Sequence, residues 1–183
     1  MWIQRIMMHK IKITQAMRDE AKQLTDRKVP ITYGCSPTGF EMPSRYVAEY
    51  TGFLGQIIYR NCLKLHHKQF IEINEINGKG DYGKDFILID STKAIVVDVK
   101  SSQMSQKYKN TKWDKLWFFL INIRQAVSPR TDYFASVQIS LNQRIGYVMG
   151  HIKPSEVQKY GILKQNTFSF NYNVMFKCLY DII

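Results

Sequence analysis

Charged residues stand at the far ends of two short apolar runs in this sequence. The segment from Gly80 to Ser102 reads GDYGKDFILIDSTKAIVVDVKSS, and its runs FILI and AIVV predict neighbouring buried strands joined by a turn at DST. Asp85 precedes the first run, whereas Asp98 and Lys100 close the second. Charged side chains are rarely buried without a partner, so this placement points to chemistry rather than to packing.

The expected register of this strand pair brings the two carboxylates together. A turn at positions 91 and 92 places Asp85 opposite Asp98, and a four-residue loop keeps the same register. Side chains alternate between the faces of a strand, so Asp85, Asp98 and Lys100 share one face. Directly opposite residues have Cβ atoms roughly 5 Å apart. We therefore expect one cluster of two carboxylates and one ammonium group.

Two carboxylates at this separation repel each other unless a cation lies between them. Oxygen ligands without a nearby His or Cys favour a hard cation, Mg²⁺ or Mn²⁺. Lys100, one step further on the same face, can then orient or deprotonate a water molecule or stabilise a pentavalent phosphate. This combination suits phosphodiester hydrolysis. The alternative is an exposed strand end whose charges are simply solvated.

The same residues resemble the motif of the PD-(D/E)xK nuclease superfamily. Asp85 is followed by FILI and, thirteen positions after it, by DVK, with Lys84 where the nominal proline would stand. The resemblance implies that Asp85, Asp98 and Lys100 are the catalytic residues. It also implies that Asp85, Asp98 and the backbone carbonyl of Val99 bind Mg²⁺ or Mn²⁺.

The family commonly adds a glutamate from the first core helix, within a pattern like GxxGE. The matching residues here are Gly52, Gly55 and Gln56, so an amide replaces the acid. Glu49 lies two helical turns earlier on nearly the same face and is an alternative metal ligand. The family pattern favours Gln56 and charge favours Glu49. A solvated helix residue is the other interpretation of Glu49.

Further polar residues after the second strand are candidate supporting groups. Ser101, Ser102 and Gln103 can hydrogen-bond a phosphate or the attacking water, although a polar loop is the simpler interpretation. Asp81 is an alternative acid if its loop folds back. Lysines interleaved with aromatic residues predict a nucleic-acid-binding surface or a solvated helix start: Lys107, Lys109, Lys112 and Lys115.

The histidines and cysteines do not predict a metal site by spacing. His66, His67 and His151 lack partners at ligand spacing, and we expect them to be structural or exposed. The odd number of cysteines and the absence of a CxxC pair argue against a disulfide framework and a zinc ribbon. We expect reduced, structural thiols at Cys35, Cys62 and Cys178.

Hydrophobic periodicity predicts a single α/β domain over residues 1–183. Its predicted core, about 44–150, is similar to the restriction endonuclease-like αβββαβ core, a mixed central sheet flanked by helices. We expect a peripheral helix capped by Thr14 and ending before Pro30, followed by a core helix from Ser44, a strand over 70–76 and the strand pair. A second core helix is expected over 113–123, and strands are expected over 133–140 and 145–150. A short helix capped by Ser155 and closed by Gly161 should follow, and then terminal strands or a final helix.

Composition narrows the class of partner. The net charge of +11 attracts polyanions, so nucleic acid is the expected partner, with DNA favoured over RNA. The first residues lack the continuous apolar region of a signal peptide, and no segment is long enough to span a bilayer. We expect a cytoplasmic protein that does not act at a membrane.

These observations predict a Mg²⁺-dependent DNA endonuclease. Because cutting both strands of a duplex is readily achieved by two symmetric sites, a homodimer is expected. One alternative is a nucleic-acid-binding module of the same fold with a weakened or inactive site. The other is an unrelated interaction protein whose basic surface is incidental.

Overall fold

The structure of the protein is a computed structural model that describes residues 8–32, 42–73, 84–90, 93–104, 118–127, 130–166, 169–175 and 179. In chain order the elements are β1 (His9–Lys12), α1 (Gln15–Thr32), α2 (Met42–Leu65), β2 (Phe70–Glu72), β3 (Phe86–Ile89), β4 (Ala94–Gln103), β5 (Phe118–Asn122), α4 (Ile123–Val127), β6 (Tyr133–Ser140), β7 (Ile145–Ile152), α5 (Pro154–Tyr160), β8 (Ile162–Asn166) and β9 (Ser169–Met175).

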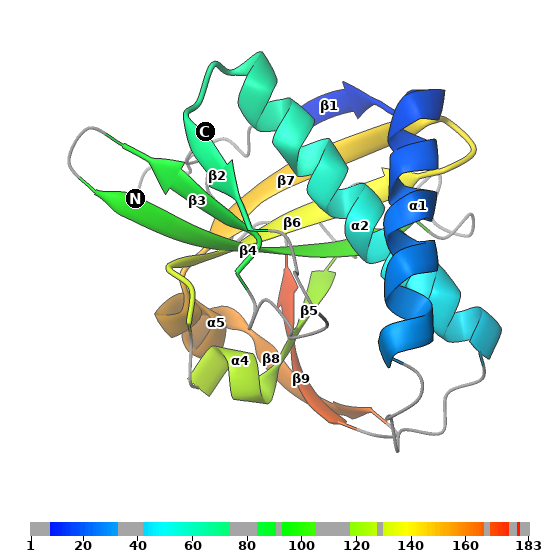
Figure 1. Ribbon diagram of the computed structural model, residues 1–183. Helices are drawn as coiled ribbons and strands as arrows, with labels where there is room; N and C mark the ends of the chain where they lie inside the picture. Colours follow the sequence, from blue (N-terminus) through cyan, green and yellow to red (C-terminus); the bar gives the residue numbers. More distant parts are fainter. Residues whose placement is uncertain are drawn as a thin grey trace.

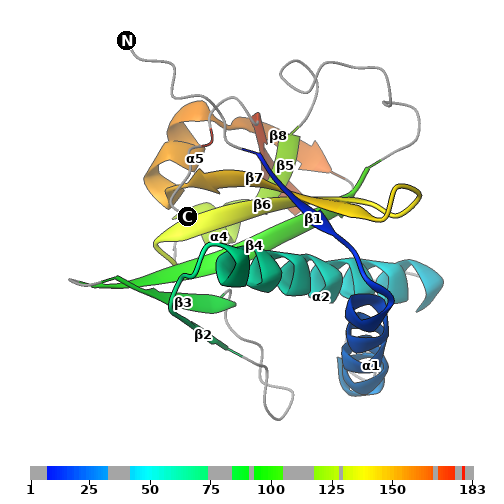
Figure 2. The same ribbon diagram turned by 90° about the horizontal axis from the view of Figure 1, so that it is seen from above.

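A mixed six-stranded sheet forms the centre of the molecule, in the order β1-β7-β6-β4-β3-β2. Strands β4 and β6 are parallel, and the other neighbouring pairs are antiparallel. Helices α1 and α2 cover one face, whereas the small sheet β5-β9-β8 and helices α4 and α5 lie on the other (Figures 1 and 2). The predicted mixed α/β fold with a central sheet flanked by helices is therefore confirmed.

The central helix α2 is the first core helix that the periodicity predicts. Its middle is fully buried against β4, β6 and β7, where Leu54, Ile58 and Leu63 are each 0% exposed. Val47 and Leu65 belong to the predicted apolar stripe but are 51% and 63% exposed. The buried positions thus run from Thr51 to Leu63, and this part of the helix positions it on the sheet.

The strand pair β3–β4 has the predicted register. Phe86 pairs with Val97, and Ile87 pairs with Val96. The backbone N–H of Asp90 donates to the carbonyl of Lys93 at 3.0 Å and closes the pair at its turn end. Phe86 and Val97 are fully buried on the side of α2. Ile87 and Val96 alternate with them and consequently face away from α2.

The prediction of a second core helix over 113–123 is wrong for the described part of that segment. Residues 118–122 form strand β5, and only the short helix α4 follows; residues 105–117 lie outside the described part of the chain. Strand β5 pairs antiparallel with β9, so that Leu120 lies opposite Asn173. The aromatic and branched residues of FFLIN suit a strand, and pairing with a distant segment overrides their helix-like spacing.

The N-terminal elements differ in two details from the expectation. Residues 9–12 form β1, an edge strand that sequence reasoning did not predict. Thr14 caps α1 as predicted, because its Oγ1 accepts the Met17 backbone N–H at 3.2 Å. The helix does not end before Pro30 but continues to Thr32. A proline near a helix end removes a single donor, so the last residues can still follow the helical path.

The short helix α5 also begins differently. Ser155 is not its cap; the helix starts at Pro154, and Lys153 is the N-cap residue. The Glu156 side chain accepts the Lys153 backbone N–H at 3.1 Å and thereby satisfies the cap position. Gly161 closes the helix as predicted. Of the two alternatives for the C-terminal segment, the described residues form strands, β8 and β9.

An ion-pair network fixes α2 relative to its neighbours. Arg60 on α2 donates to Glu20 on α1 at 2.8 Å and to Glu72 on β2 at 3.2 Å. The hydrogen bond to Glu20 is the largest cause of the raised pKa of Arg60. The Arg60 side chain is 17% exposed. One partly buried charge therefore joins α2 to α1 and β2.

Candidate active site

The carboxylate of Asp85 lies at the end of β3 and continues the ladder to β4. Its backbone carbonyl accepts the N–H of Ile73 at 2.8 Å, whereas its Oδ2 accepts the N–H of Val99 at 2.5 Å. The side chain thus occupies the position that a backbone carbonyl would take in a longer strand. Asp85 is only 3% exposed, so this carboxylate is held within the fold.

Asp98 and Lys100 stand beside Asp85 on the neighbouring strand. The regular ladder ends at the pair Phe86 and Val97, and the Asp85 backbone N–H donates to the Val97 carbonyl at 3.0 Å. The Nζ of Lys100 lies 2.8 Å from Oδ2 of Asp98. Asp98 is 3% exposed, and the Lys100 side chain is 21% exposed. The structure therefore pairs Lys100 with Asp98 and sets Asp85 against the β4 backbone on either side of Asp98. The ammonium group offsets the buried negative charge of Asp98.

The backbone of Val99 faces the same point. Its N–H donates to the Asp85 carboxylate, and in a strand the N–H and C=O of one residue point to the same neighbouring strand. The Val99 carbonyl consequently faces the Asp85 side of β4. This orientation agrees with the ligand role that the family resemblance implies.

Helix α2 contributes an amide to the site. Gln56 Nε2 donates to Oδ1 of Asp85 at 2.6 Å. The helix approaches β4 closely here, because a Cβ on Gly55 would lie 2.3 Å from the Cβ of Ser101. Glu49 points elsewhere and pairs with Lys28 of α1 at 3.1 Å. Of the two alternatives for the helix residue, Gln56 is the one in contact with the Asp85 carboxylate.

The candidate supporting residues hold β4 in place. Ser102 Oγ donates to the Gln138 side chain of β6 at 2.8 Å, whereas Gln103 Nε2 donates to Thr51 Oγ1 of α2 at 2.8 Å. Ser101 Oγ donates to the Thr51 carbonyl at 2.9 Å. Their hydrogen bonds thus fix the strand that carries Asp98. The candidates that lie outside the described residues are Asp81, Lys107, Lys109, Lys112 and Lys115.

Sequence reasoning missed two polar residues on β6. Ser136 pairs with Lys100 and Gln138 pairs with Ser102 in the parallel ladder, so they share the face of Asp98. Within the described part of the chain, Ser136 Oγ and Gln138 Nε2 are buried without a hydrogen-bond partner. Buried polar atoms normally bind a partner such as water. The polar alternation in YFASVQIS is the signal that could have identified this face.

The donor set can be tested against the expected metal. Asp85 and Asp98 supply buried carboxylates from adjacent strands, and the Val99 carbonyl faces the same point. All of these donors are oxygens, which Mg²⁺ and Mn²⁺ prefer. The residues present therefore fit a hard divalent cation.

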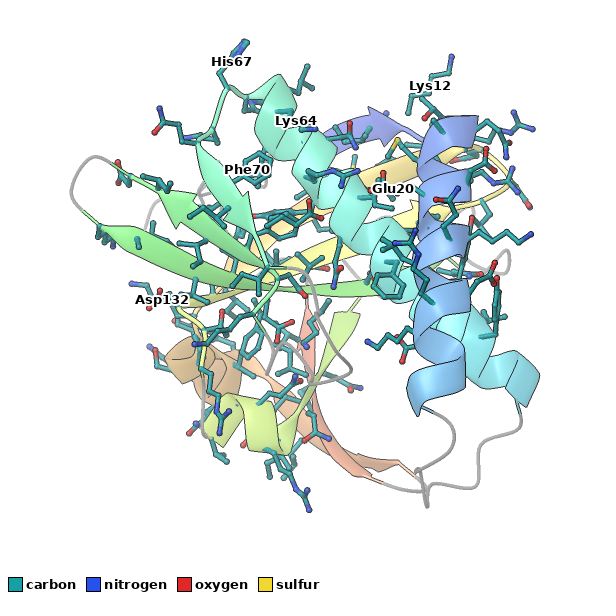
Figure 3. The ribbon with its side chains drawn as sticks, viewed as in Figure 1. Lys12, Glu20, Lys64, His67, Phe70 and Asp132 are labelled. Carbon is teal, nitrogen blue, oxygen red and sulfur yellow. The ribbon has the colours of Figure 1, made fainter. Side chains whose placement is uncertain are left out.

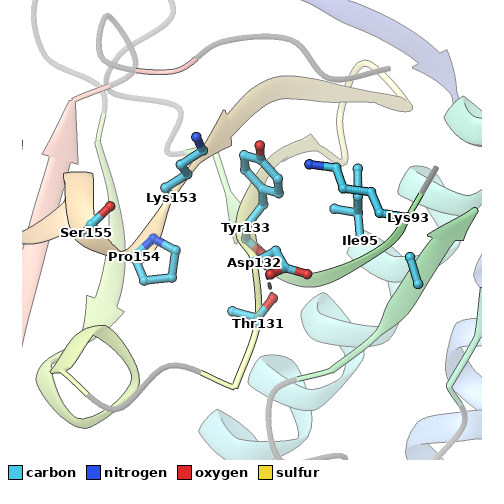
Figure 4. A pocket seen from close by; sticks show the side chains of 9 residues that line it. Lys93, Ile95, Thr131, Asp132, Tyr133, Lys153, Pro154 and Ser155 are labelled. Atoms are coloured by element: carbon cyan, nitrogen blue, oxygen red, sulfur yellow. Dashed lines mark hydrogen bonds between the residues drawn. The ribbon is translucent and has the colours of Figure 1, made fainter. Parts of the chain in front are cut away.

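A separate hollow of about 380 Å³ lies towards the turn end of the strand pair (Figure 4). Lys93 and Lys153 stand on opposite sides of it, and Asp132 accepts the Val96 N–H at 2.8 Å beside it. The Nζ of Lys153 lies 5.9 Å from the Tyr133 ring centroid. Its lining does not include Asp85, Asp98 or Lys100, so the hollow is not part of the carboxylate site.

Comparisons with known proteins include a distant structural likeness. Neither a protein-family model nor a curated protein matches the chain. A solved bacterial homing endonuclease, I-Ssp6803I, is similar with a TM-score of 0.40 and 13% sequence identity, over 69% of this chain and 74% of that chain. A similarity this low carries no argument about activity. Among the described residues, no helix is both long and apolar enough to cross a membrane.

Proposed function

We propose that the protein is a metal-dependent nuclease of the PD-(D/E)xK type that hydrolyses phosphodiester bonds in DNA as an endonuclease. One observation carries this proposal: the carboxylates of Asp85 and Asp98 are buried on adjacent strands, and the Lys100 ammonium lies 2.8 Å from Asp98. Two acids and a lysine at one point provide metal ligands and a positive charge for the reacting phosphate.

Each residue has a distinct role in this reaction. Asp85, Asp98 and the Val99 carbonyl would hold Mg²⁺ or Mn²⁺. The bound cation supplies Lewis-acid activation of the phosphate and neutralises developing negative charge. Gln56, hydrogen-bonded to Asp85 at 2.6 Å, orients that carboxylate. Lys100 orients the attacking water or stabilises charge on the phosphate once Asp98 binds the cation.

The charge of the protein supports a nucleic-acid substrate. A net charge of +11 on 183 residues attracts the phosphate backbone of DNA. The lysines between positions 107 and 115 are proposed backbone contacts. Binding through phosphates should weaken steeply with salt, so the salt dependence of affinity measures how many contacts are made.

The decisive experiment compares Asp98→Asn with Asp90→Asn. Asp90 is an exposed carboxylate at the other end of the same strand pair, so its variant is a matched control for charge. Plasmid, branched and single-stranded DNA are incubated with each protein across a Mg²⁺ titration. We expect Asp98→Asn to lower the cleavage rate by about 100–1,000-fold, because a metal ligand is lost.

The same experiment identifies the result that contradicts the proposal. DNA affinity and thermal stability should stay near the unsubstituted values, since backbone contacts lie elsewhere. Full cleavage by Asp98→Asn, or an equal loss of cleavage in Asp90→Asn, would contradict the active-site assignment. Cleavage that persists in excess chelator would show that the reaction does not depend on a metal.

A second candidate function is DNA binding without cleavage. Gln56 supports it, because an amide stands where the family commonly has a glutamate, and a neutral ligand attracts a cation less than a carboxylate does. Tight, salt-dependent binding with no Mg²⁺-dependent product on any of the three DNAs would favour this function.

We also propose a homodimer, because cleavage of both strands of a duplex is readily achieved by two active sites in symmetric positions. Sedimentation at micromolar concentration, with and without DNA, measures the assembly. A monomer under both conditions would contradict the dimer and leave the active-site proposal intact.

A further inference from the structure

Three metal-ligating side chains meet at the opposite end of α2 from its first turn. The ligand atoms of His9, Cys62 and His66 all lie within 4.8 Å of one another. His9 comes from β1, whereas Cys62 and His66 come from α2. These residues are separate from the carboxylate site in both position and chemistry.

The fold explains why these three residues meet. Cys62 and His66 are four positions apart and therefore lie on one face of the helix. On the edge strand β1, His9 shares a face with Ile11, which is packed into the core beside α2. Pairing of His9 with Val148 fixes the register of that strand. The sheet therefore positions the His9 imidazole at the C-terminal end of α2.

The end of α2 fixes the third residue. The backbone N–H of Lys68 donates to the carbonyl of Leu63 at 3.0 Å, and that of His67 donates to Lys64 at 3.1 Å. This pattern is a Schellman motif, which needs a left-handed residue, and His67 has φ 54°. Glycine usually occupies that position, because other residues are strained there. The strained turn ends α2 at Leu65 and holds His66 directly after it.

We propose that His9, Cys62 and His66 form a Zn²⁺ site. Two imidazole nitrogens and a thiolate sulfur are ligands that zinc binds at about 2.0–2.3 Å. In a tetrahedral site these atoms lie about 3.3–3.6 Å apart, so the observed separations need to contract by no more than about 1.5 Å. The imidazole rings of His9 and His66 are already 4.5 Å apart between centroids, edge to face. Small side-chain rotations therefore suffice.

The donor types distinguish this site from the carboxylate site. Nitrogen and sulfur donors select zinc or copper over Mg²⁺, and three protein ligands leave a fourth position for water or a further group of the chain. Cys62 is fully buried and loses its proton when the metal binds. The bound ion joins the edge strand β1 to the end of α2, so its role is to stabilise the N-terminal strand.

The test is a titration of the chelator-treated full-length protein with Co²⁺ and then Zn²⁺. Co²⁺ reports its ligands directly, through the thiolate-to-metal charge-transfer band and the intensity of the tetrahedral d–d bands. We expect one tightly bound ion per chain, a thiolate band, and displacement of Co²⁺ by Zn²⁺. Saturation at about 100 times the Kd should raise Tm by about 5–10 °C.

Two exposed histidines at the same helix end provide the variants. His66→Ala should weaken Zn²⁺ binding by at least about 100-fold. His67→Asn is the matched control, because asparagine tolerates the left-handed backbone and His67 projects outward from the end of α2 (Figure 3). Cys62→Ser should remove the thiolate band; if that buried variant is unstable, His66→Ala still decides the proposal.

The outcomes separate this site from the proposed nuclease. A Co²⁺ spectrum without a thiolate band, or unchanged affinity in His66→Ala, overturns the zinc site. Equal weakening in His66→Ala and His67→Asn overturns it as well. Neither result changes Mg²⁺-dependent cleavage, and loss of cleavage in Asp98→Asn leaves the Co²⁺ spectrum unchanged.

Discussion

Helix α2 carries two sets of donor atoms whose chemistry differs. Near its middle, Gln56 contacts the Asp85 carboxylate, where all candidate metal ligands are oxygens. At its C-terminal end, Cys62 and His66 meet His9 with nitrogen and sulfur atoms. One rigid helix can therefore serve two sites without mixing them, because donor type rather than position selects the metal.

The two regions also differ in how they remain folded without a metal. The carboxylate site contains buried charge, which Lys100 offsets at 2.8 Å from Asp98. The ligands of the histidine–cysteine cluster can all be uncharged before metal binding. Removal of Mg²⁺ should consequently abolish the proposed cleavage with little effect on Tm. Removal of Zn²⁺ should lower Tm and leave the catalytic residues in place.

Among these substitutions, Lys100→Ala should produce the largest difference between the effect on cleavage and the effect on Zn²⁺ binding. Loss of the ammonium removes the positive charge beside Asp98, so we expect the cleavage rate to fall by about 100-fold or more. Zn²⁺ affinity should remain within about twofold. Lys93→Ala is the control, because Lys93 is an exposed lysine before β4 at the opposite end of the strand pair. Single-turnover cleavage and a Zn²⁺ titration measure both effects; retained cleavage would show that Lys100 is not part of the reaction.

A substitution in the helix should disturb the carboxylate region more than the histidine–cysteine region. The added Cβ of Gly55→Ala meets the Ser101 Cβ at 2.3 Å, so α2 and β4 must separate. We expect a loss of about 2 kcal/mol, or a Tm lower by about 4–8 °C, together with slower cleavage. Gly52→Ala is the matched control on the same helix, because a Cβ there meets nothing within 4 Å and alanine favours a helix. Equal stability of the two variants would contradict the close contact.

The smallest effect is expected from the helix side chains themselves. Gln56→Ala removes the hydrogen bond that orients Asp85, and we expect cleavage to slow by about 10-fold at subsaturating Mg²⁺. Glu49→Gln should change cleavage by less than about twofold, because Glu49 pairs with Lys28 and not with the site. Mg²⁺ titrations of the cleavage rate show which of the two variants is more impaired. A larger effect of Glu49→Gln would restore the alternative that charge alone favoured.

Local patterns were sufficient to predict the strand pair and its register. The apolar runs, the turn between them and the two-residue alternation predict the pairing of Ile87 with Val96, which the structure has. The helix α2 was also predictable, because its apolar residues recur at helical spacing over many turns. Both predictions depend on regular spacing within one segment.

Contacts between distant segments lie beyond what spacing predicts, and the prediction of a second core helix failed for this reason. Residues 118–122 have helix-like spacing, but pairing with β9 makes them a strand. His66 lacked a partner at ligand spacing, because its neighbour His9 lies on the edge strand, far away in sequence. His151 is fully buried and lies 2.7 Å from the Tyr59 hydroxyl, a contact between β7 and α2 that no spacing rule contains.

The sequence by itself determined the donor types, the basic charge and the alternation that puts Asp98 and Lys100 on one face of β4. The tertiary structure decided which helix residue joins them, since Glu49 is drawn to Lys28 and Gln56 reaches Asp85. It also decided that His9 meets Cys62 and His66. The physical reason is the distance along the chain over which each feature is decided. Side-chain alternation follows from the geometry of a single strand, whereas contacts between elements depend on how buried surfaces pack.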